Sequence, residues 1–231
     1  MLAYQFDWSV IVRNAPKLLD ALLLGLGLAV TALLAGSLLG LILAYGRLAG
    51  RRWLDWAIWA YVEAIRNTPL LLLIFFVYFG VPEIFAIFDL YRYDIRPPDK
   101  IPSFLITLSL YAAAYMCEVF RAGLASIPRQ YLEAARAIGL RPLQRQLWVV
   151  LPVMLRITLP SIANNLISLF KDTSLATAIA VPELTFTARQ INANTFRVME
   201  AWLTASALYL AVSYALALVL RAVERRYAVI R

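Results

Sequence analysis

The feature that most constrains this chain is a run of 26 residues, 21–46, without a single charged side chain. A run of this length can cross the hydrocarbon core of a bilayer with some tilt. It is too long for the core of a signal peptide, and no convincing small-residue cleavage site is found, so we interpret it as a retained first span. Gly36 and Gly40 within it have the spacing that lets two helices approach closely, which predicts a packing role.

Further apolar segments follow, and together they indicate one integral membrane domain of about five transmembrane helices. We expect the spans at 18–46, 57–80, 101–125, 153–181 and 201–221. The composition agrees, because 62% of the 231 residues are hydrophobic, which is too many for an ordinary soluble domain. The intervening segments 81–101 and 183–200 are polar and are expected to be loops. The predicted fold class is an all-α integral membrane protein.

Residue types that are missing from the chain exclude most cofactor chemistry. There is no histidine, and Cys117 is the only cysteine, so we expect no zinc site, no iron–sulfur cluster and no internal disulfide. None of the three lysines, Lys17, Lys100 and Lys171, follows a glycine, so the chain has no phosphate-binding P-loop and cannot be an ATPase. The basic residues are scattered between apolar runs, which argues against nucleic-acid binding.

The distribution of these basic residues predicts the orientation in the membrane. If the N-terminus lies outside, the inner segments contain 14 basic and 5 acidic residues, and the outer segments contain 8 and 9. Cytoplasmic loops carry the excess of arginine and lysine in membrane proteins. We therefore expect the N-terminus outside and the C-terminus in the cytoplasm.

A charged stretch from Tyr131 to Pro152 interrupts the apolar segments, and it does not belong in lipid. A short helix pattern begins near Glu133, and Gly139 can supply the positive φ that turns the chain. A second short helix then leads to Pro152. The sequence thus predicts a helix, a bend and a helix outside the membrane.

The spacing of this stretch resembles the cytoplasmic E-A-A loop of the membrane subunits of ATP-binding-cassette importers. Glu133-Ala134-Ala135 is followed at the family's intervals by Gly139, and then by Val149, Leu151 and Pro152, with Val149 in place of the usual isoleucine. The resemblance implies a type I importer fold in which this loop, 129–148, forms coupling helices seated in a cleft of the ATPase. The alternative is an ordinary amphipathic loop helix. The implied coupling residues are Glu133, Ala134, Ala135, Arg136, Gly139 and Arg141.

Segments 61–80 and 118–182 resemble more specifically the polar amino acid uptake branch, the permeases for histidine, glutamine or glutamate. The resemblance implies a multi-pass protein of the bacterial inner membrane, surrounded by lipid, that binds no cofactor itself. The implied partners are an ATPase dimer that holds ATP and Mg, a second permease subunit (identical or homologous), an extracytoplasmic solute-binding protein and a polar amino acid.

Two acid–base pairs occur at a spacing of one helical turn within these segments. Glu63 lies three residues before Arg66, and Glu118 three residues before Arg121. Such pairs can form local ion pairs on a helix. They could also belong to a gate or a substrate site. For Glu63 and Arg66 we favour the local ion pair.

A polar stripe in the fourth span gives the candidate substrate path. Small hydroxyls on such a face commonly serve only as helix-packing contacts, but an asparagine or an ionisable group at membrane depth usually faces a cavity or a partner. The span is also interrupted at Lys171-Asp172, and discontinuous helices are common at transport sites. The stripe recurs at intervals of 3, 4, 3 and 4 residues: Thr158, Ser161, Asn165, Ser168 and Asp172. The candidate path residues are Asn164, Asn165, Ser168, Lys171, Asp172 and Thr173.

Three classes of function remain at this point. The leading one is the permease subunit of an ATP-driven amino acid importer. A membrane-embedded enzyme would need catalytic carboxylates in the membrane, and the chain has no clustered pair of acids. A purely structural membrane subunit would not need a polar stripe in its fourth span.

Overall fold

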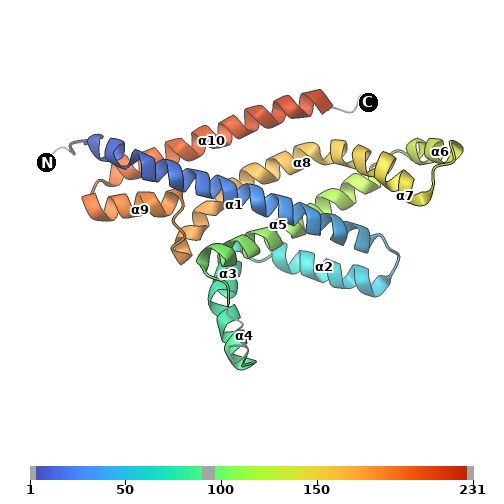
Figure 1. Cartoon of the computed structure of the whole chain (residues 1–231), viewed down its shortest axis with the longest axis horizontal. Coiled ribbons are helices and arrows are strands. Elements are labelled where there is room, and N and C mark those ends of the chain that lie inside the picture. The colour runs from blue at the N-terminus through green and yellow to red at the C-terminus, as the bar shows by residue number, and fades with distance from the viewer. Residues whose placement is uncertain (1–3, 90–96, 228–231) are drawn as a thin grey trace.

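The computed structural model describes residues 4–89 and 97–227. Four long helices run along its long axis, and Figure 1 shows them side by side, with the shorter helices at their ends, alongside them or projecting from their middle. They are α1 (Ser9–Arg47), α5 (Lys100–Ala125), α8 (Leu151–Asp172) and α10 (Val198–Tyr227). Within the described ranges the chain is helical without a β-strand, in agreement with the predicted fold class.

The seam between α1 and α5 forms the tightest part of the core. A Cβ atom on Gly36 would lie 2.5 Å from the Cβ of Ala112, and one on Gly40 would lie 2.6 Å from the Cβ of Met116. Carbon atoms in ordinary contact lie about 3.5–4.0 Å apart. Only glycine lets the two helices come this close, so the packing role predicted for Gly36 and Gly40 is confirmed.

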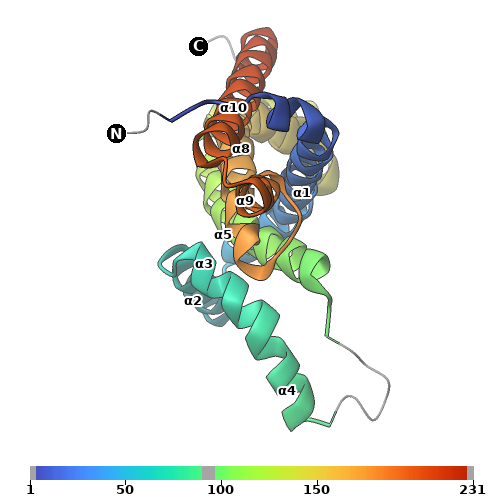
Figure 2. The same ribbon diagram turned by 90° about the vertical axis from the view of Figure 1, so that its left-hand side faces the viewer.

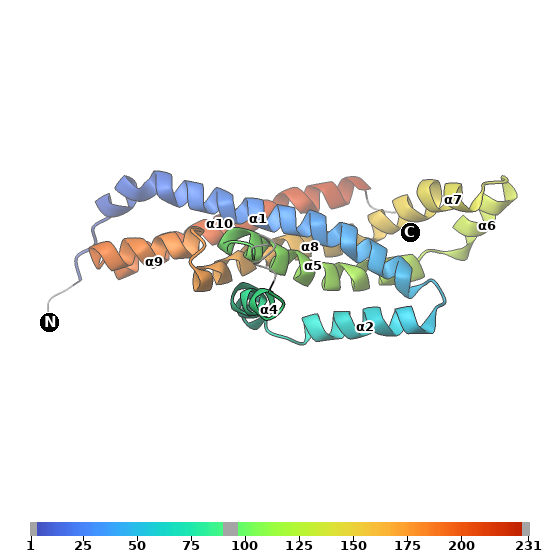
Figure 3. The same cartoon turned by 60° about the horizontal axis from the view of Figure 1, so that its bottom comes forward.

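A second candidate span is present, at Leu70–Ile87, but the predicted bounds, 57–80, are wrong, because they join two separate helices. The hairpin helix α2 (Arg52–Arg66) runs back along α1, as Figure 3 shows, and a break at 67–69 follows it. Pro69 has no N–H and disfavours helical geometry at Thr68. The apolar helical stretch starts only at Leu70.

This stretch forms an arm that leaves the bundle. It consists of α3 (Leu70–Phe75), a π-helical turn, η1 (Phe76–Gly80), and α4 (Val81–Ile87), and Figures 1 and 2 show it pointing away from the long helices. Residues 81–87 were expected in a loop. Pro82 does not prevent the helix, because it lies in the first turn of α4, where its missing N–H is not needed.

The charged stretch folds as predicted into two helices with a bend. The helix α6 (Arg129–Ala137) is followed by α7 (Pro142–Arg145), a π-helical turn, η3 (Gln146–Val150), and then α8. Gly139 has a φ of +77°, so the predicted positive φ is confirmed. The hydroxyl of Tyr45 near the end of α1 donates to the side chain of Gln146 at 3.1 Å, which links this region to the bundle.

The segment 183–200 is not the predicted loop. After α8 the chain continues as a 3₁₀ helix, η4 (Thr173–Ile179), turns at Ala180, and forms α9 (Leu184–Thr195). The carboxylate of Glu183 caps α9 by accepting from the backbone N–H groups of Thr185 and Phe186, both at 2.8 Å. A side-chain cap satisfies donors that the first turn of a helix leaves free.

Five helical stretches are long and apolar enough to cross a membrane: Ser9–Leu48, Leu70–Ile87, Lys100–Ala125, Pro142–Ile179 and Val198–Arg226. The first and last of these extend beyond the predicted spans at both ends. Figures 1 and 3 place the N-terminal end of α1 and α9 at one end of the molecule and α6 and α7 at the other. These two groups of helices therefore form surfaces at opposite ends of the molecule (Figures 1 and 3).

Candidate functional site

Side chains of α5 and α8 line a cavity of about 430 Å³, which we call the upper hollow. The hydroxyl of Tyr111 donates to that of Tyr115 at 3.1 Å, and the side-chain amide of Asn165 donates to the carbonyl of Ser161 at 2.9 Å. The second bond leaves the Asn165 carbonyl oxygen free to accept from a ligand. The polar lining of the upper hollow consists of Tyr111, Tyr115, Asn164, Asn165, Ser168 and Asp172.

A second cavity of about 510 Å³, the lower hollow, is lined by the parts of α5 and α8 that lie nearer to α6 along the chain. Thr158 and Ser161 of the predicted stripe line this cavity instead of the upper one. The stripe on α8 therefore does face open space, but it is divided between two hollows. The polar lining of the lower hollow consists of Arg66, Glu118, Ser126, Thr158 and Ser161.

Two of the predicted path residues do not line the upper hollow. Lys171 is exposed, and Thr173 is fully buried, with its hydroxyl donating to the carbonyl of Phe170 at 2.6 Å. The physical reason is helix geometry, because each residue turns the side chain by about 100° and only Asp172 of the three points toward Ser168. Thr173 instead packs against α1, where its Oγ1 would lie 3.2 Å from a Cβ on Gly25.

The acid–base pair on α5 is present and belongs to a larger network. Arg121 Nη2 lies 2.6 Å from Glu118 Oε2. Arg47 at the end of α1 contacts the other oxygen of Glu118, and its Nε lies 2.8 Å from Asp55 Oδ1 of α2. Sequence reasoning missed the bond between Arg47 and Glu118, because the two residues are 71 positions apart. The network joins the ends of three helices.

The pair expected on α2 does not form. Among the described residues, no ion pair joins Glu63 to Arg66. The carboxylate of Glu63 accepts from the side-chain amide of Asn67 at 2.8 Å, and the guanidinium of Arg66 lies over the ring of Tyr115, 5.4 Å from its centroid. A stacked guanidinium gains a cation–π attraction that competes with a pairing to its own helix neighbour.

The E-A-A helix α6 presents mostly charged and small side chains to the outside. Glu133, Ala134 and Arg136 are exposed, and so are Gly139 and Arg141 in the bend and at the start of α7. Ala135 is the exception, because it is 3% exposed and faces the chain's own loop. Its own chain therefore covers Ala135, whose role in coupling stays a prediction.

Apolar side chains next to these residues make the loop surface suitable for a protein partner. Ile138 is 74% exposed, and Leu143 and Trp148 are 68% and 64% exposed. Arg136 and Arg145 line a cavity of about 460 Å³ between α6 and α7. Apolar groups mixed with arginine are typical of protein–protein interfaces.

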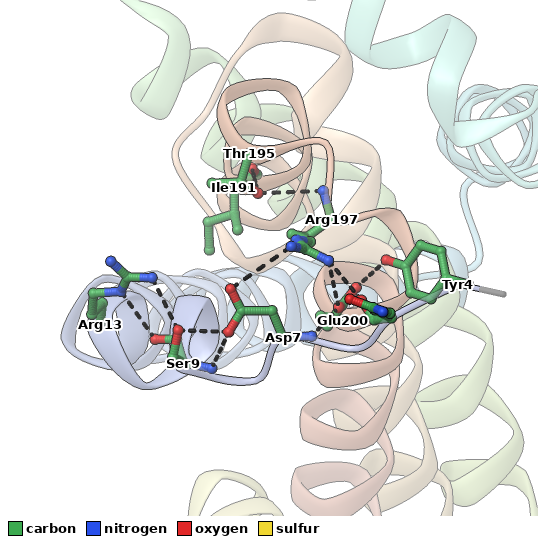
Figure 4. Close-up of polar contacts among 9 residues, drawn as sticks. Tyr4, Asp7, Ser9, Arg13, Ile191, Thr195, Arg197 and Glu200 are labelled. Carbon is green, nitrogen blue, oxygen red and sulfur yellow. Dashed lines mark hydrogen bonds and ion pairs between the residues drawn. The ribbon is translucent and has the colours of Figure 1, made fainter. Parts of the chain in front are cut away.

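At the opposite end, an N-terminal strap, residues 4–8, is bound to the start of α10 (Figure 4). The buried carboxylate of Glu200 accepts from the Tyr4 hydroxyl and, at 2.7 Å, from the Asp7 N–H. Arg197 Nη2 lies 3.9 Å from Asp7 Oδ2, and Arg197 Nη1 lies 3.9 Å from Glu200 Oε1. Hydrogen bonds from Ser9 hold the pKa of Asp7 below its ordinary value, and the bond to Glu200 raises the pKa of Tyr4. Sequence reasoning missed this network, because Tyr4 and Glu200 are 196 residues apart.

The arrangement of a polar hollow in the membrane and an exposed two-helix loop agrees with the comparison to known proteins. The family described as "binding-protein-dependent transport system inner membrane component" matches residues 36–229. The chain belongs to this family. Membership makes it a transport subunit of the inner membrane, so the membrane-embedded enzyme and the purely structural subunit are set aside.

Individual relatives align with nearly the whole of this chain. It is 33% identical to the glutamine transport system permease protein of Escherichia coli, over 96% of this chain and 98% of the relative. It is 34% identical to the glutamate/aspartate import permease protein of Escherichia coli, over 97% and 100%. The crystal structure of an amino acid ABC transporter with histidines has a TM-score of 0.82 at 26% identity, over 96% of this chain and 100% of that one.

Proposed function

We propose that this chain forms the translocation path of an ATP-driven importer for a polar amino acid. The observation that carries the proposal is the upper hollow, where amide and hydroxyl groups of α8 face two tyrosines of α5. Asn164, Asn165 and Ser168 can exchange hydrogen bonds with the polar groups of an amino acid, and the Asp172 carboxylate can accept from its ammonium. The names of the relatives support the same substrate class.

Transport requires partners that this chain does not contain. We expect a second permease subunit, identical or homologous, two ATPase subunits that hold ATP and Mg, and an extracytoplasmic solute-binding protein. The exposed loop of α6 and α7 is the proposed docking site for the ATPase, with Glu133, Ala134, Arg136 and Arg141 as contacts and Gly139 as the turn. In this arrangement the C-terminus and the loop are cytoplasmic, and the N-terminal strap lies outside.

Reconstituted transport tests the proposal. Proteoliposomes that contain the permease and the ATPase, supplied with the solute-binding protein and a panel of radiolabelled amino acids, should show ATP-dependent uptake. Asn165→Ala and Ser168→Ala should change the uptake rate or the selectivity. Ser213→Ala on α10 is the matched control, because Ser213 lines neither hollow and its buried hydroxyl has no hydrogen-bond partner among the residues that the structure describes. Unchanged uptake and selectivity in both α8 variants would favour a packing role for the stripe.

A further inference from the structure

Glu118, which lines the lower hollow, belongs to a network of paired charges. Arg47 bridges Asp55 and Glu118, and Glu118 also binds Arg121. Two carboxylates and two guanidinium groups thus form one continuous chain of ion pairs. Both oxygens of Glu118 are occupied, because Oε1 accepts from Arg47 and Oε2 from Arg121, whose Nε also lies 3.3 Å from Oε1.

Arg66 lines the same hollow but lies outside this chain of ion pairs. Within residues 4–89 and 97–227, no carboxylate lies within 4.0 Å of its guanidinium, and the neighbouring acid, Glu63, binds Asn67. Arg66, whose side chain is exposed, therefore adds one positive charge beside a network whose two acidic and two basic side chains balance.

The position of Arg66 places it between the two hollows. Its guanidinium lies 5.4 Å from the centroid of the Tyr115 ring, and Tyr115 lines the upper hollow together with Asn165 and Ser168. Arg66 itself lines the lower hollow. The contact between Arg66 and Tyr115 therefore joins the linings of the two hollows.

The guanidinium of Arg66 suits a particular ligand chemistry. It carries five N–H donors in one plane, and its cation–π contact with Tyr115 does not use them to bind a carboxylate. This planar set of donors matches a carboxylate, which it can bind through two parallel hydrogen bonds. Across the upper hollow, Asp172 offers the opposite charge.

We propose that Arg66, held over Tyr115, is a specificity-determining residue that binds the carboxylate of an amino acid as it passes between the two hollows. The inference rests on the proposed transport function and assigns one step of it. Asp172 attracts the ammonium group in the upper hollow, and Arg66 attracts the carboxylate at the boundary with the lower one. A cationic molecule without a carboxylate gains nothing at Arg66.

The test measures uptake kinetics of radiolabelled L-glutamine and L-glutamate by proteoliposomes with wild-type ATPase and solute-binding protein. We expect Arg66→Gln to lower kcat at least tenfold, whereas KM changes little, because the binding protein captures the substrate first. Arg66→Lys should lie between wild type and Arg66→Gln, because it keeps the charge but loses the planar donors. Tyr115→Leu should lose less than Arg66→Gln, because the guanidinium remains.

A purely structural role for Arg66, as a pin between α2 and α5, predicts a different pattern. Removing either Arg66 or Tyr115 would then cause the same loss of uptake rate, so equal defects in Tyr115→Leu and Arg66→Gln would overturn the proposal. An uptake rate of Arg66→Gln within twofold of wild type would overturn it as well. Co-purification with the ATPase and basal ATP hydrolysis show that each variant is folded, and if Arg66→Gln does not assemble, the comparison of Arg66→Lys with Tyr115→Leu still decides. Failure of wild-type uptake would instead count against the transport function.

Discussion

Replacing Gly40 by alanine should weaken the seam between α1 and α5. The new methyl carbon would lie 2.6 Å from the Cβ of Met116 and 2.9 Å from the backbone nitrogen of Cys117. Neither atom can rotate away, so the helices must separate by about 1 Å to restore ordinary contact distances. Overpacking of this kind costs about 1–3 kcal/mol. Gly36→Ala, which places a methyl 2.5 Å from the Cβ of Ala112, should behave alike.

Gly27→Ala provides a matched control in the same helix. No atom lies within 4 Å of a Cβ at Gly27, so this substitution should only gain helix propensity, up to about 1 kcal/mol. A change of 1 kcal/mol shifts the melting temperature of a domain of this size by about 2–4 °C. We therefore expect Gly40→Ala to melt roughly 2–12 °C below Gly27→Ala.

The single cysteine provides the assay. Cys117 is fully buried beside the seam, so a thiol-reactive dye added to the detergent-purified chain during heating reports when the seam opens. Equal melting temperatures for Gly27→Ala and Gly40→Ala would refute the packing argument.

Three further predictions concern the loop, the α9 cap and the topology. Gly139→Val should strain the bend by about 1–3 kcal/mol and uncouple ATP hydrolysis from uptake. Gly50→Val, at the other positive-φ glycine (φ +71°), should strain the chain without uncoupling hydrolysis from uptake. Equal transport in the two variants would contradict a coupling role for Gly139. Glu183→Ala leaves Tyr209 and two backbone N–H groups without their acceptor, so it should lower the stability measured in the dye assay by about 1–3 kcal/mol. Glu183→Gln should lose less stability. An unchanged melting temperature of Glu183→Ala would contradict this role of the cap. Single cysteines at Ser126 and Ser174, in a Cys117→Ala background, should react with impermeant reagents from opposite sides of the membrane, and labelling from one side alone would overturn the orientation.

Local chemistry explains which features could be predicted from the sequence. Gly36, Gly40 and Gly139 were predictable, because the need for a missing Cβ or a positive φ is a property of a few adjacent residues. The polar stripe was predictable for the same reason, since its period follows from helix geometry. The break before Leu70 could have been found from Pro69, whose effect the long apolar run concealed.

Contacts between distant residues explain most of what was missed. The bonds of Arg47 to Glu118 and of Tyr4 to Glu200 depend on how helices far apart in the chain come together. The inward direction of Ala135 depends on the packing of α6 against its own loop. The helix α9 was missed because its cap is a glutamate, whereas serine, threonine, aspartate and asparagine are the usual signals.

The arm formed by α3, η1 and α4 has a consequence for how the protein is made in the cell. Only 11% of this apolar stretch is buried by its own chain, and Leu72, Phe76 and Phe79 are more than half exposed. Its side chains must therefore be covered by lipid or by a neighbouring subunit after insertion. A copy synthesised in excess of its partners leaves this arm in lipid without a neighbouring subunit, so membrane quality-control proteases should recognise it there, and the amount of permease in the membrane would follow the supply of the subunits that cover it.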